Sequence, residues 1–169
     1  MMATSDINLI EDYLQHGHTL NDIKNTCGPI TVREISGKSD IEVFRAFVKN
    51  GFTIKRGSSV KMIISSLKEL GVNLSPPKYL YTKIDIDDPR TVYHPCDMPV
   101  EERDYVQPYM GKSLKEMRNY FTKGMFVLYT NGHVFYMKDG TPHDTQTRRR
   151  IGNNRKVTMI QKVLENVAG

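Results

Sequence analysis

Cysteine, tryptophan and long apolar runs are scarce in this chain of 169 residues, which has two cysteines and no tryptophan. Two cysteines in unlike contexts do not form the disulfide framework of small secreted proteins, so we expect a reduced, cytoplasmic location. No apolar run approaches the roughly 20 residues that span a bilayer. The segment from Met1 to Asp12 also lacks the basic stretch of a signal peptide. We therefore expect neither a membrane protein nor a secreted one.

The chain also lacks an internal repeat and a low-complexity segment. Hydrophobic residues make up 38% of it, which is enough apolar material for a single core. We expect one domain over residues 1–169. A long irregular insertion is expected around residues 87–111, where four prolines and many charges interrupt any periodicity. Its length suggests a function or contact with a partner.

The chain up to residue 71 carries the periodicity and the capping residues of four short helices. These helices are expected from Ser5 to near Gly17, from Cys27 to Gly37, from Ser39 to Asn50, and from Ser58 or Ser59 to Gly71. Pro76-Pro77 then breaks the pattern, and one strand is expected between residues 79 and 86. A second capping box at Ser113 predicts a helix that ends at Gly124.

From Met125 onward the apolar period falls to two, which is typical of strands. Strands are expected at 125–129 and 133–138, and Asp139-Gly140 predicts a hairpin into a short third strand. A last pair of strands is expected on the two sides of Gly152-Asn153-Asn154. Helices followed by an antiparallel sheet make the fold class α+β.

Three residue types that can do acyl-transfer chemistry occur in a suitable order. Cys27 opens a helix, where unpaired backbone N–H groups and the helix dipole favour thiolate over thiol. His133 opens a strand and could take the thiol proton, while Asp144 lies across the hairpin and could orient the imidazole. The Cys27 backbone N–H and the Asn21 side chain could donate to a developing oxyanion. Each residue alone has a structural interpretation, but their joint order favours catalysis.

Other donor atoms do not form a recognisable site. His16-Gly17-His18 has no acid or cysteine partner, and Cys96 lies in a proline-rich stretch without a helix end to activate it. We expect no metal and no cofactor.

The net charge is +5, and basic residues crowd near the C-terminus at Arg148, Arg149, Arg150, Arg155 and Lys156. No aromatic residues interleave with them to stack bases, so a solvent-facing hairpin is the favoured interpretation. Nucleic-acid binding through this segment is expected to be weak, non-specific and sensitive to salt.

Two segments of the chain, residues 20–70 and 112–160, carry recognisable motifs. The first has Cys27-Gly28-Pro29 at a helix start, followed by Gly37-Lys38, Glu42-Val43 and Arg56-Gly57. The second has Gly132-His133-Val134, Asp139-Gly140 and His143-Asp144-Thr145, followed by Arg149-Arg150. With these motifs the chain resembles the papain-like cysteine peptidase superfamily, and most closely small papain-like proteins encoded by bacteriophages. Superfamily members commonly place Gln six residues before the nucleophile, and this chain has Asn21 there.

The resemblance implies a papain-like fold with Cys27 as nucleophile, His133 as base and Asp144 as the orienting acid. It also implies a cysteine peptidase or related thiol hydrolase that acts on an amide or isopeptide bond in a protein or peptide, in the host cytoplasm. The alternative is a catalytically inactive papain-like phage protein that serves as a virion component or binds a host protein. A basic nucleic-acid-binding module is a third possibility.

Overall fold

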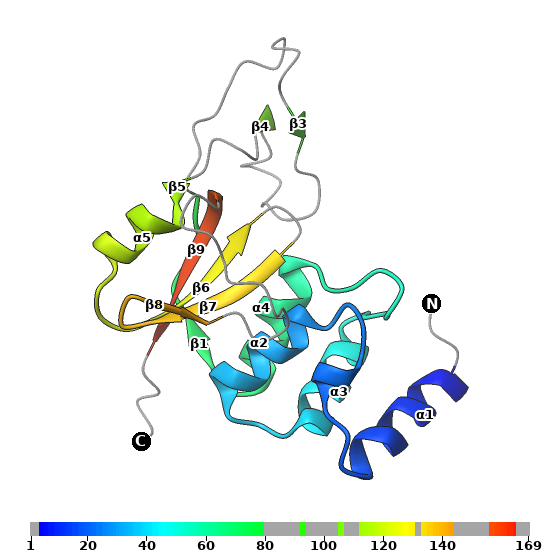
Figure 1. Cartoon of the computed structure of the whole chain (residues 1–169). Helices are drawn as coiled ribbons and strands as arrows, with labels where there is room; N and C mark the ends of the chain where they lie inside the picture. Colours follow the sequence, from blue (N-terminus) through cyan, green and yellow to red (C-terminus); the bar gives the residue numbers. More distant parts are fainter. Residues whose placement is uncertain are drawn as a thin grey trace. The chain divides into compact units, whose positions relative to one another are not determined.

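The computed structural model describes residues 4–79, 92–93, 105–106, 112–130, 133–143 and 156–164. Figure 1 shows helices in the first part of the chain and an antiparallel sheet in the second, so the predicted α+β class is confirmed. The chain folds into two compact units. Within the described residues, the first is helical and ends at Asn73, and the second begins at Leu74 and contains the sheet strands.

The helical unit contains four α-helices and one short 3-10 helix within the described residues. They are α1 (Thr4–Gln15), η1 (Leu20–Asp22), α2 (Cys27–Ser36), α3 (Asp40–Lys49) and α4 (Val60–Glu69). The four α-helices confirm the predictions from periodicity, whereas η1 was not predicted. Their apolar faces form a core with three phenylalanines at its centre. The Phe52 ring meets Phe44 and Phe47 edge to face, at centroid distances of 6.5 and 5.8 Å.

The predicted helix starts are confirmed at three serines. Ser39, Ser59 and Ser113 have extended backbone conformations, and each hydroxyl accepts a hydrogen bond from the N–H three residues later, at 3.2, 3.2 and 3.3 Å. These bonds satisfy N–H groups that have no acceptor inside the helix. At the other end of α2, Gly37 takes the left-handed conformation, with φ of 69°. The capping residues therefore fix where these helices begin and end.

The second unit is organised around β9 (Lys156–Leu164), which pairs antiparallel with β6 (Met125–Thr130). The sheet continues from β6 to β7 (His133–Lys138) and β8 (Thr141–His143), and β1 (Asn73–Leu74) lies beyond β9. Two more short strands, β2 (Lys78–Tyr79) and β5 (Lys112–Ser113), also pair with β9. The chain's last predicted strand therefore becomes a central strand, because it inserts beside β6.

Helix α5 (Leu114–Tyr120) covers a cluster of buried apolar residues on the sheet. The cluster consists of Leu114, Met117, Phe126, Leu128, Phe135, Met137, Val157 and Ile160. The prediction that this helix runs to Gly124 is wrong, because the helix stops at Tyr120. Phe121 leaves the helical conformation and places its ring 4.7 Å from that of Phe126. Packing of this ring against the cluster therefore accompanies the early end of the helix.

The expected insertion around 87–111 lies mostly outside the described residues. Its described parts are β3 (Val92–Tyr93) and β4 (Tyr105–Val106), which pair antiparallel as a separate two-stranded sheet. The predicted strand on the N-terminal side of Gly152-Asn153-Asn154 also lies outside the described residues.

Candidate functional site

Cys27 is the first residue of α2, and its thiol is free and half-buried. The preceding residue, Thr26, is buried and does not use its side chain to cap the helix. Its hydroxyl instead lies 2.8 Å from both the Leu20 and Ile23 carbonyl oxygens. The Thr26 side chain therefore fixes the loop ahead of Cys27 rather than covering the helix end.

The first turn of α2 offers two backbone N–H groups without an acceptor inside the helix. Pro29 has no N–H, and the Ile30 N–H bonds the Thr26 carbonyl at 2.9 Å. This leaves the N–H groups of Cys27 and Gly28, which lie at the positive end of the helix dipole. Such a place favours an anion, either a thiolate or the oxygen of a tetrahedral intermediate.

Gly28 allows a close approach between the starts of α2 and α4. A Cβ at this position would meet the Ser58 hydroxyl, and it would lie 2.7 Å from Ser58 Cβ. A side chain at this position would therefore require Ser58 to shift. The Ser58 Oγ is buried and has no hydrogen-bond partner among the described residues. Glycine beside Cys27 is thus explained by the close packing of Ser58, a contact that the sequence alone did not reveal.

Asn21, the predicted oxyanion donor, lies exposed on η1. Its Oδ1 accepts a hydrogen bond of 2.8 Å from Arg33 Nη1 of α2. Arg33 also pairs with Asp40 at 3.3 Å and with Glu34 at 2.9 Å. The NH₂ group is the only part of the Asn21 amide that can donate to an oxyanion. The role of Asn21 as oxyanion donor stays a prediction.

Asp40 connects this arrangement to the backbone of η1. Its Oδ2 accepts a hydrogen bond of 2.8 Å from the N–H of Leu20, a residue that is fully buried. Arg33 and Asp40 side chains are 18% and 20% exposed, so solvent screens their interaction less than it screens a surface pair. Neither Arg33 nor Asp40 was among the predicted site residues, although their opposite charges on two successive predicted helices were visible in the sequence.

His133 is the first residue of β7, as predicted, and it is half-buried. It lies opposite Thr130 of β6. Strand alternation places it on the same face as Phe135, and the two ring centroids are 6.1 Å apart. His143 of β8 instead stacks on Tyr136, at 4.8 Å, on the opposite face of the sheet. The two histidines of this sheet are therefore in distinct surroundings.

The predicted site residues fall into three groups. Cys27 and Asn21 belong to the helical unit, and His133 belongs to the sheet unit. Asp144, Cys96 and the basic residues Arg148, Arg149, Arg150 and Arg155 lie outside the described residues, whereas Lys156 is exposed at the start of β9. The meeting of Cys27 with His133 and Asp144 stays a prediction.

The histidines of the 16–18 segment have local partners. His16 Nδ1 lies 2.7 Å from the Asp12 carbonyl oxygen, and the His18 ring stacks on Tyr13 at 3.8 Å. Among the described residues, no group of three His, Cys, Asp or Glu side chains is placed to hold a metal ion. The described helices also include none that is both long and apolar enough to cross a membrane.

Comparison with protein-family models, with curated proteins and with solved structures found no match.

Replacement of Gly28 by Ala should lower the free energy of unfolding by about 1–3 kcal/mol, because the new methyl group overlaps Ser58. Denaturant unfolding would measure this loss. The added variant Ser58→Gly removes both atoms that crowd the methyl group, so the double variant should recover part of the loss. A double variant with the summed losses of the two single variants would contradict this account.

Asp40→Ala should lower the free energy of unfolding by about 2 kcal/mol. The change leaves the buried N–H of Leu20 without its acceptor and removes one partner of Arg33. Glu34→Ala is the matched control, since Glu34 is a more exposed partner of the same arginine, and its loss should stay within about 0.5 kcal/mol. Equal losses in the two variants would mean that the Leu20 contact is unimportant.

Proposed function

We propose that the protein is a cysteine hydrolase of papain-like fold that cleaves an amide or isopeptide bond through a Cys27 thioester. The observation that carries the proposal is the position of Cys27, half-buried at the first residue of α2 beside two N–H groups without a helical acceptor. Nucleophilic cysteines are commonly activated at helix N-termini and by a neighbouring histidine. The resemblance in the Gly-His-Val motif supports His133 as that histidine.

The proposed reaction starts with transfer of the Cys27 thiol proton to His133. The thiolate then attacks the carbonyl carbon of the substrate, a C–S bond forms, and the carbonyl electron pair moves onto oxygen. The N–H group of Cys27, with Asn21, would stabilise that oxyanion. The C–N bond breaks as the imidazolium of His133 gives its proton to the leaving amine.

Water completes the cycle. His133 removes a proton from water, which attacks the thioester carbonyl, and the acid is released as the C–S bond breaks and Cys27 regains its proton. In this scheme Asp144 accepts the second N–H of the imidazole and stabilises its cation. Residues of this chain supply every proton transfer, so the scheme needs no metal or cofactor. The substrate is proposed to be a protein or peptide in the host cytoplasm.

Iodoacetamide should alkylate Cys27 faster than Cys96 at neutral pH, and His133→Ala should slow alkylation of Cys27 by about tenfold. The reason is that an ordinary cysteine is only a few per cent thiolate near pH 7, so loss of an imidazolium partner lowers the reactive fraction strongly. Mass spectrometry of tryptic peptides over time would measure both rates.

The matched control is His143→Ala, because His143 lies on the same sheet but stacks on Tyr136. This control should alkylate at the wild-type rate. Faster reaction of Cys96, or an unchanged rate in His133→Ala, would exclude the proposed pair. An inert Cys27 in a protein that associates with virion proteins would favour the non-catalytic alternative.

Asp144→Asn should give an alkylation rate between those of wild type and His133→Ala, because Asn still contacts the imidazole but stabilises its cation less. The matched control is Asp139→Asn on the same hairpin, whose carboxylate accepts a hydrogen bond of 2.9 Å from the Gly124 N–H. This control should change thermal stability and leave the alkylation rate unchanged. A wild-type rate in Asp144→Asn would reduce the proposed triad to a dyad.

A further inference from the structure

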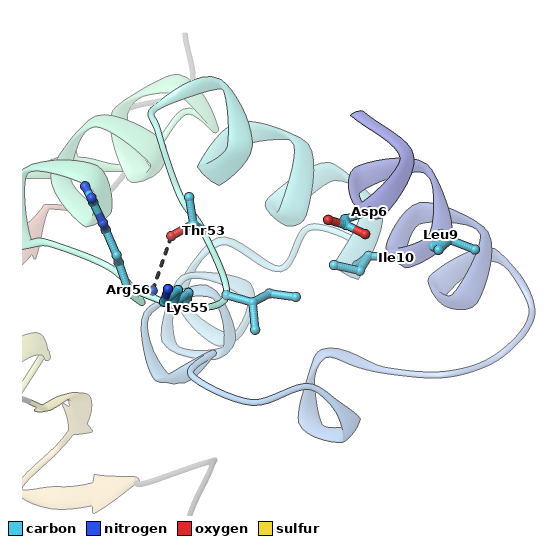
Figure 2. A pocket seen from close by; sticks show the side chains of 7 residues that line it. Asp6, Leu9, Ile10, Thr53, Lys55 and Arg56 are labelled. Atoms are coloured by element: carbon cyan, nitrogen blue, oxygen red, sulfur yellow. Dashed lines mark hydrogen bonds between the residues drawn. The ribbon is translucent and has the colours of Figure 1, made fainter. Parts of the chain in front are cut away.

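The helical unit contains a pocket of about 780 Å³ that the proposed chemistry does not use. Figure 2 shows its two walls. One wall is α1, which contributes Asp6, Leu9 and Ile10, and the other is the turn at residues 53–56. The α1 residues are spaced by three and four positions, so they lie along one face of the helix.

The turn that forms the second wall is held by several hydrogen bonds. Thr53 accepts from the Gly57 N–H at 2.8 Å through its carbonyl and from the Arg56 N–H at 3.2 Å through its hydroxyl. The Ile54 carbonyl accepts from Asn25 Nδ2 at 2.7 Å. Asn25 itself has a φ of 59°, a conformation that asparagine tolerates better than most residues. This wall is therefore preformed rather than shaped by a ligand.

The charge of the pocket lining is positive. Lys55 and Arg56 are exposed, and neither forms an ion pair with another described residue. Arg33, Arg45 and Lys49 of the same unit are each paired with carboxylates, whereas Lys61 resembles Lys55 and has no ion pair with another described residue. Asp6 is the acidic residue among those that line the pocket. The Arg56 side chain extends away from α1 in Figure 2, so Lys55 is the cation better placed for a ligand that lies against α1.

Apolar surface continues from the pocket along α1. Leu9 is 66% exposed, and Tyr13, one face of which stacks on the His18 ring, is 39% exposed. The four-residue spacing places both on one side of the helix. They are two of the three large hydrophobic residues that are exposed in the described part of the chain. Clustered exposed apolar residues beside a pocket are typical of a binding site.

We propose that this pocket binds a peptide segment of a partner protein in which a large aliphatic side chain is flanked by carboxylates. The aliphatic side chain would contact Leu9, Ile10 and Ile54, and a carboxylate would meet Lys55. A second copy of this chain is less complementary, because a twofold contact would place two linings of the same net positive charge against each other. The proposal concerns binding alone and does not depend on the chemistry of Cys27.

The probe is a short fluorescein-labelled peptide that carries one leucine between glutamates, titrated with the full chain and followed by fluorescence anisotropy. Replacement of the leucine by serine should weaken binding by about tenfold, since the peptide loses one buried apolar side chain. Replacement of the glutamates by glutamines should weaken it by about fivefold, and so should Lys55→Glu in the protein. Arg56→Glu should have a smaller effect than Lys55→Glu.

Leu9→Ser tests the apolar wall at a site exposed enough to leave folding intact, and it should weaken binding by about threefold. The matched control is Lys61→Glu, because Lys61 is an exposed lysine of α4 that does not line the pocket, and it should bind as wild type does. Cys27→Ser should also bind normally, which separates this proposal from the proposed reaction.

Three outcomes would overturn the proposal. The first is equal binding of the leucine and serine peptides, which would reduce the site to a surface that attracts any anion. The second is an equal loss of peptide binding in Lys55→Glu and Lys61→Glu, which would also show that any positive surface attracts the peptide. The third is concentration-dependent dimerisation that Leu9→Ser abolishes in sedimentation experiments, which would assign the surface to a second copy of the chain.

Discussion

The position of the proposed nucleophile depends on the hydrogen bonds that fix the backbone from Leu20 to Gly28. The Asp40 carboxylate, which lies outside this segment, accepts a hydrogen bond from the Leu20 N–H. The Thr26 hydroxyl, which lies within it, donates to the carbonyl oxygens of Leu20 and Ile23. Because the Thr26 hydroxyl is used in this way, α2 begins without a side-chain cap. The result is a helix start that follows a fixed loop, where the N–H groups of Cys27 and Gly28 have no acceptor inside the helix.

Much of the fold could be predicted because the relevant signals are local. Ser39, Ser59 and Ser113 indicate helix starts, and Gly37 ends α2 with a positive φ that its lack of a side chain permits. The 125–143 strands follow from an apolar period of two and a tight turn at Asp139-Gly140. The features that were predicted wrongly or not at all are non-local. The end of α5 and the central place of β9 depend on packing between residues distant in the chain, which no local pattern encodes.

The same distinction applies to the candidate site. The sequence was sufficient to place Cys27 at a helix start and His133 at a strand start, since both follow from flanking residues. It did not reveal that Ser58 crowds Gly28, or that Arg33 holds Asn21, because these contacts join separate helices. Nor did it reveal the pocket, whose walls are α1 and a turn more than forty residues further along the chain. Chemistry-bearing residues were visible in the sequence, whereas the residues that position them were not.

The pocket and the start of α2 share one structural element. The turn that lines the pocket bonds Asn25 through the Ile54 carbonyl, and Ser58, shortly after the turn, packs directly against Gly28. These two contacts fall on either side of Thr26 and Cys27. The turn that lines the pocket therefore also helps to hold the backbone on both sides of the proposed nucleophile. The wall of the pocket and the start of α2 thus depend on the same packing within the helical unit, because residues 53–58 contact Asn25 on one side and Gly28 on the other.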